Sequence, residues 1–87
     1  SVLSAKETEL NQSRVYPNPA KTEIFVELKS RNATASIYDS KGSLIRSGLK
    51  MNSGKNRIDV SAFTSGVYFI ELSDDSNQVT THKFIKN

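Results

Sequence analysis

Turn-forming residues interrupt this sequence about every 8 to 12 residues, and short β-prone segments lie between them. The segments alternate apolar and polar side chains, which is the pattern of a strand with one buried face. No stretch shows the 3.6-residue period of an amphipathic helix. The pattern therefore predicts an all-β fold, an immunoglobulin-like antiparallel β-sandwich of about seven short strands.

The alternation also predicts which side chains face the core. The inward side chains expected from it are Ile24, Val26, Leu28, Ala35, Ile37, Asn56, Ile58, Val60, Tyr68, Ile70 and Leu72. Phe25, Tyr38 and Phe69 are expected to point outward. The last strand stays ambiguous, because Val79 and Ile85 lie on one of its faces and Phe84 on the other.

Three turns are predicted, at residues 39–42, 52–54 and 74–77, from their aspartate, asparagine and glycine content. In the first, Asp39 caps the turn and Gly42 supplies a positive φ angle. Gly48 interrupts a strand pattern, which indicates a bulge or a bend.

The segment "AFTSGVY", residues 62–68, has the pattern of a crossover between two sheets. Phe63 is expected to plug the sandwich, Gly66 to allow the turn and Tyr68 to begin the next strand. We expect the Tyr68 ring in the core, with its hydroxyl bonded to a nearby backbone group. An ordinary strand tyrosine would also be buried here.

Both prolines of the chain lie in "YPNP", residues 16–19. Residues 1–13, ahead of them, are polar and without a sustained period, and we interpret them as a flexible linker from a longer protein. Each proline favours extended geometry in the residue before it. We therefore predict a stiff corner where the linker meets a folded domain of residues 14–87.

Composition argues against several kinds of partner and site. The chain has no cysteine, so neither a disulfide framework nor a thiolate metal site is expected. The net charge of +3 is spread without a basic run, which argues against nucleic acid as a partner. No apolar stretch approaches the roughly 20 residues of a membrane-spanning helix, and the N-terminus does not resemble a secretory signal.

No group of side chains indicates catalysis. His82 is the only histidine, and we interpret it as an ordinary, partly exposed side chain. Asp74 and Asp75 suit a turn better than a calcium loop. Glu23 and Glu27 would lie about 13 Å apart on a strand, too far for paired-carboxylate catalysis. The prediction is a domain that is not an enzyme and takes no cofactor, metal ion or small-molecule substrate.

Three segments, in this order, resemble the C-terminal sorting domain (type A) of type IX secretion system cargo proteins. They are "VYPNPAKTEIFVEL", "SIYDSKGSLI", and "SGVYFIEL" with a terminal "KFIKN". The likeness spans about residues 14–87. It implies a signal that is recognised in the periplasm of a Gram-negative bacterium by the outer-membrane translocon and its shuttle protein. A sortase-like cysteine peptidase would then cut the upstream linker, leaving the cargo on the cell surface or released.

Carried over by position, the residues of the family's motifs are Pro17, Asn18, Pro19, Gly42, Gly66, Tyr68, Lys83, Phe84, Ile85 and Lys86. The leucine–proline that often precedes the glycine of the family is replaced here by an aromatic plug without proline. Residues 79–86, as an edge strand, are expected either to pair with the receptor or to be guarded by lysines. An exposed edge would also allow a homodimer.

Two alternatives remain open at this point. A carbohydrate-binding or adhesion module would use exposed Phe25, Tyr38 or Phe69 as a platform for sugar rings. A structural spacer would only stabilise its parent protein. The absence of tryptophan, and the ordinary occurrence of single exposed aromatics on small domains, favour the sorting signal.

Overall fold

The computed structural model describes residues 13–29 and 32–87. These residues form seven β-strands, which are β1 (Arg14–Tyr16), β2 (Glu23–Leu28), β3 (Ala33–Asp39), β4 (Leu44–Met51), β5 (Gly54–Asp59), β6 (Gly66–Ser73) and β7 (Val79–Lys86). The linker predicted over residues 1–13 lies outside the described part of the chain, except for Ser13.

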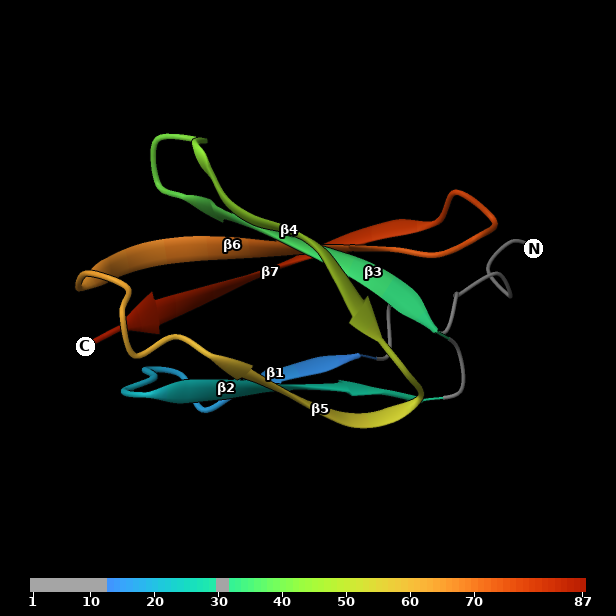
Figure 1. The fold of residues 1–87 in the computed structure, drawn as a ribbon, viewed down its shortest axis with the longest axis horizontal. Coiled ribbons are helices and arrows are strands. Elements are labelled where there is room, and N and C mark those ends of the chain that lie inside the picture. The colour runs from blue at the N-terminus through green and yellow to red at the C-terminus, as the bar shows by residue number, and fades with distance from the viewer. Residues whose placement is uncertain (1–12, 30–31) are drawn as a thin grey trace, which may run out of the picture.

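The strands form two antiparallel sheets that face each other (Figure 1). One sheet has three strands in the order β1-β2-β5, and the other has four in the order β4-β3-β6-β7. In immunoglobulin notation, β1, β2 and β5 correspond to strands A, B and E, and β3, β6 and β7 to strands C, F and G. The predicted immunoglobulin-like sandwich of seven strands is confirmed.

The core consists of the inner faces of both sheets. Its fully buried large side chains are Phe84, Ile24, Ile37, Ile70, Leu72, Val26 and Val60. On β2, buried residues alternate with half-buried ones, and Phe25 points outward as predicted. Asn56, predicted inward, is half-buried, and its amide donates to the Val26 carbonyl at 3.1 Å. A polar side chain is tolerated there because it has a partner.

Local turn chemistry accounts for the hairpins. The Asp39 carboxylate accepts hydrogen bonds from the backbone N–H groups of Lys41 and Ser43, both at 2.9 Å, and Gly42 has φ +87°. Asp74 does the same for Ser76 and Gln78, at 2.9 and 3.0 Å, so the predicted turn at residues 74–77 is confirmed. The carboxylates of Asp39 and Asp74 therefore stabilise these turns.

Gly48, with φ +69°, lies at an irregularity in the β3–β4 pairing. Between the pairs Ala35–Leu49 and Ile37–Arg46, β4 advances three residues while β3 advances two. The extra residue is a β-bulge, as the position of this glycine predicted.

The crossover between β5 and β6 has the predicted plug. Phe63 is buried, and its ring centroid lies 5.0 Å from that of Tyr68, which in turn stacks on Phe84 at 5.5 Å. The Tyr68 hydroxyl donates to the Thr64 carbonyl at 2.7 Å. A tyrosine near the start of strand F, bonded to the backbone a few residues upstream, is the tyrosine corner of immunoglobulin-like domains.

Candidate recognition site at the C-terminal strand

Strand β7 is an edge strand of the four-stranded sheet, and the segment after β1 lies along its last residues. Ala20 forms a parallel bridge with Lys86. The Ala20 N–H donates to the Ile85 carbonyl at 2.7 Å, and the Asn87 N–H donates to the Ala20 carbonyl at 2.8 Å. The fully buried Ala20 therefore joins the two sheets at the end of the chain.

Asn18 contacts the same edge of β7, next to Ala20. Its side-chain amide donates to the Lys83 carbonyl at 3.3 Å, and its side-chain oxygen accepts from the Ile85 N–H at 2.9 Å. The backbone groups that an edge strand normally exposes are thus occupied at Lys83, Ile85 and Asn87. We expected residues 79–86 to pair with the receptor or to be guarded by lysines, whereas the segment between β1 and β2 covers the C-terminal half of this edge.

The two prolines explain how the corner makes this contact. Pro17 and Pro19 are exposed, follow cis peptide bonds and have no backbone N–H to donate. The hydrogen bonds to β7 must therefore come from the side chain of Asn18 and from the backbone of Ala20. The "PNP" motif thus places the Asn18 side chain, between its two prolines, against the edge of β7.

The structure also resolves the ambiguous faces of β7. Phe84 is fully buried and Lys86 is 8% exposed, whereas Val79 and Ile85 are 56% and 38% exposed. The Lys86 ammonium donates to the Asn87 carbonyl at 3.2 Å. The terminal motif therefore divides into an inner pair, Phe84 and Lys86, and an outer pair, Lys83 and Ile85.

Most of the motif residues carried over from the family meet at this end of the sandwich. Gly66 pairs with Lys86, and Tyr68 pairs with Phe84. Gly42 lies in the β3–β4 hairpin, which follows Asp39, the cross-strand partner of Tyr68. Sequence reasoning missed Ala20, since a single alanine after a proline carries no sign of its strand partner.

At the other half of β7, His82 contacts the beginning of the described chain. It is half-buried, and its Nε2 lies 2.7 Å from the Ser13 hydroxyl oxygen. Burial lowers the pKa of His82 below its usual 6.5, because the charged form loses hydration. The interpretation of His82 as a partly exposed side chain is confirmed.

This pKa predicts how stability depends on pH. A lowered folded-state pKa means that the unfolded chain takes up a proton first, so the contribution of neutral His82 is complete above pH 6.5 and is lost as the pH falls toward the folded pKa. We expect urea unfolding to show lower stability at pH 5.5 than at pH 7.5, and His82→Gln to flatten this slope. Equal slopes in both proteins would contradict the assignment, since the chain has no other histidine.

The Asn18 contact predicts a local effect. Asn18→Ala should cost about 1 to 2 kcal/mol, because it removes two hydrogen bonds to the β7 backbone. Amide exchange measured by NMR should accelerate at Ile85, whereas the Phe84 amide, which faces β6, should keep its protection. The Lys21→Ala variant, at an exposed neighbour, is the control and should change neither. Unchanged Ile85 protection in Asn18→Ala would refute the contact.

Other kinds of site receive no support from residues 13–29 and 32–87. These residues contain no group of three or more histidine, aspartate or glutamate side chains placed to hold a metal ion. The same residues include no helix with the length and apolar composition needed to cross a membrane. Glu23 and Glu27 lie on the outer face of β2, where Arg57 and Arg14 pair with them.

Comparison with known proteins identifies the kind of domain. Residues 14–87 match the family model described as the secretion system C-terminal sorting domain. The chain is 34% identical over 67 residues to β-agarase A of Zobellia galactanivorans and 34% identical over 74 residues to a funoran endo-β-hydrolase of Wenyingzhuangia aestuarii. It is 36% identical over 76 residues to an endo-acting ulvan lyase of Formosa agariphila.

The alignments cover 75%, 82% and 83% of this chain but only 12%, 10% and 14% of those three enzymes. The shared part is thus a small fraction of each enzyme. The family match spans both the "PNP" corner and the terminal strand that the corner holds. This chain therefore belongs to the family of C-terminal sorting domains of type IX secretion system cargo.

Proposed function

We propose that the outer-membrane translocon and its shuttle protein recognise this domain in its folded form and carry the attached cargo across the outer membrane. The observation that carries the proposal is the family match over residues 14–87, which coincides with the folded sandwich. Family membership implies an interaction with the secretion machinery and a secreted or surface location. The named components, and passage through the periplasm, are our proposal.

A folded signal is supported by the contacts of the last strand. Asn18 bonds to Lys83 and Ile85, which lie 65 and 67 positions away in the chain. An isolated C-terminal peptide lacks these contacts, as well as the core in which Phe84 is buried. The conformation of the terminal motif therefore depends on the rest of the sandwich.

We place the cleavage site of a sortase-like cysteine peptidase upstream of Ser13, within the predicted linker. Ser13 is 7% exposed and its hydroxyl bonds to His82, so its backbone belongs to the packed domain. A peptidase needs an extended, accessible substrate, which packed residues do not offer. After the cut, the cargo remains on the cell surface or is released.

The cargo itself is inferred from the relatives. Each of them is named as an enzyme that degrades a polysaccharide, and this domain matches a small part of each. We propose that the upstream protein is likewise a polysaccharide-degrading enzyme. In this proposal the domain catalyses nothing and takes no cofactor, and the chemistry belongs to the cargo.

A transfer experiment tests the function. Residues 1–87 are fused behind a fluorescent reporter with its own periplasmic signal, in cells with and without a type IX translocon. We expect reporter on the surface or in the medium only when the translocon is present, with the domain removed. A fusion lacking residues 83–87 should leave the reporter in the periplasm, because the deletion takes Phe84 from the core.

Reporter held in the periplasm of both strains, with the intact domain folded, would overturn the sorting function. A spacer would instead change the stability of its parent protein and leave secretion unaltered.

A further inference from the structure

The two edges of the four-stranded sheet are poor templates for an added strand. Asn18 and Ala20 occupy the outer edge of β7 at its C-terminal half. Strand β4, the opposite edge, is bulged at Gly48 and carries a second register shift nearer its start. Covered and bulged edges are devices that prevent strand addition. Recognition of this sheet is therefore better sought on its outer face.

That face carries a row of four side chains in register, one from each strand. Leu44 on β4 pairs with Tyr38 on β3, Tyr38 pairs with Phe69 on β6, and Phe69 pairs with Lys83 on β7. We call these residues the outer row. Leu44 is 54% exposed, and the two aromatic rings are half-buried. Cross-strand neighbours of this kind lie close enough to form one continuous surface.

A second apolar pair extends the outer row. Val67 on β6 pairs with Ile85 on β7, and Ile85 is 38% exposed. Both residues occur on the same side of their strands as Phe69 and Lys83, because side chains alternate along a strand. A contiguous apolar surface that crosses all four strands is the kind of feature that marks an interaction site.

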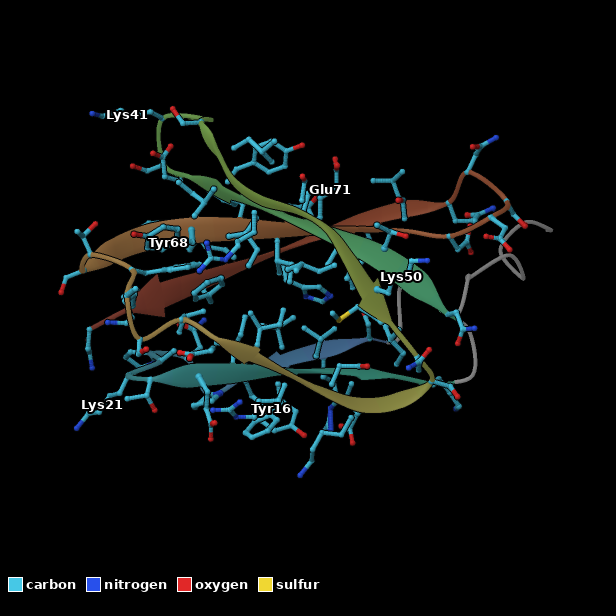
Figure 2. All side chains as sticks on the ribbon, in the orientation of Figure 1. Tyr16, Lys21, Lys41, Lys50, Tyr68 and Glu71 are labelled. Carbon is cyan, nitrogen blue, oxygen red and sulfur yellow. The ribbon has the colours of Figure 1, made fainter. Side chains whose placement is uncertain are left out.

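The outer face of the three-stranded sheet differs, although it also carries aromatic rings. Phe25 lies against Tyr16, with centroids 5.8 Å apart, and the Lys55 ammonium lies 5.0 Å from the Phe25 centroid. Figure 2 shows Tyr16 on this outer side and Glu71 on the outer side of the other sheet. Within the described residues, the rings of Tyr38 and Phe69 have neither a ring partner nor a cation over them.

Lys83 is the charged member of the outer row. It is exposed, and among residues 13–29 and 32–87 it forms no ion pair. Its cross-strand partner is Phe69, whereas the acidic Glu71 pairs with Thr81. A partner that covers the outer row must either leave this ammonium in water or offer it a carboxylate, and the second arrangement adds both affinity and orientation.

We propose that the outer row, with Val67 and Ile85, docks on an apolar protein surface of the secretion machinery that presents a carboxylate to Lys83. This inference rests on the proposed function, because the machinery is the partner that a sorting domain must meet. The apolar side chains supply the area, and Lys83 fixes the orientation. The three-stranded sheet, where Tyr16 and Lys55 lie against the Phe25 ring and two arginines pair with glutamates, faces away from the partner.

Two phenylalanines provide a matched test in the reporter fusion. Phe69 and Phe25 are both half-buried, point outward and lie on inner strands of their sheets. We expect Phe69→Lys to lower export at least tenfold and Phe25→Lys to change it less than twofold. Far-ultraviolet circular dichroism and melting of the purified fusions report folding. Lys83→Glu, at an exposed position, tests the same face without touching the core and should also lower export.

Each outcome decides the proposal. Normal export of folded Phe69→Lys and Lys83→Glu fusions would overturn it, as would equal losses in Phe69→Lys and Phe25→Lys. If Phe69→Lys does not fold, the Lys83→Glu result alone decides.

Two results would assign this face to another partner. If the wild-type domain sediments as a dimer and the Phe69→Lys variant as a monomer, the face is a self-interface. Glycan-array binding lost on Tyr38→Ala or Phe69→Ala would make it a sugar platform. If the wild-type fusion is not exported, the proposed function is refuted, and this inference with it.

Discussion

We expect the Phe84→Ala variant to lose about 3 to 5 kcal/mol of unfolding free energy, which is a large share of the stability of a small domain. Phe84 is fully buried and its ring stacks on Tyr68 at 5.5 Å. Truncation removes these contacts and leaves a cavity between the sheets at the end where the terminal motif is held. Urea unfolding, followed by far-ultraviolet circular dichroism, measures the loss.

The neighbouring Ile85→Ala variant is the matched control for Phe84→Ala. It shortens a side chain on the same strand, but Ile85 is 38% exposed and faces away from the core. We expect it to cost less than about 1 kcal/mol. Similar losses in the two variants would show that the assigned inner and outer faces of β7 are wrong.

The second large effect is expected from Tyr68→Phe, which should cost about 1 to 2 kcal/mol. The substitution keeps the ring in the core and removes only the hydroxyl that donates to the Thr64 carbonyl at 2.7 Å. In a domain of this size, that loss lowers the melting temperature by roughly 4 to 16 °C. Differential scanning calorimetry provides the measurement.

Tyr38→Phe serves as its control, because it removes the same atom from a half-buried tyrosine on the outer face. We expect a change within about 0.5 kcal/mol. An equal loss of stability in both variants would mean that the tyrosine corner contributes nothing specific. The pair also separates stability from recognition, since Tyr38 belongs to the proposed docking face and Tyr68 does not.

Several features of the fold were predictable because they depend on nearby residues. The alternation of Ile24, Val26 and Leu28 gives one buried face whatever the partner strand is. Asp39 and Gly42 form their turn through contacts within five residues. The family's motifs were also recognisable, and residues 14–87 match its model.

The candidate site was predictable only in part. The "PNP" corner was expected as a stiff joint, but its hydrogen bonds to Lys83 and Ile85 were not. Nothing local to Asn18 points to a partner so far along the chain. The recognition roles of the motif residues stay predictions, as does a homodimer formed through an edge strand.

The sequence by itself determined the strand content, the turns and the family, because each of these depends on residue type and short spacing. Tertiary structure decided which face of β7 is buried, since apolar residues lie on both faces and only packing against Tyr68 selects Phe84. It also decided that Asn18 and Ala20 cover the β7 edge, and that Leu44, Tyr38, Phe69 and Lys83 align. Register between strands distant in sequence arises from the packing of both sheets together, and no local pattern encodes it.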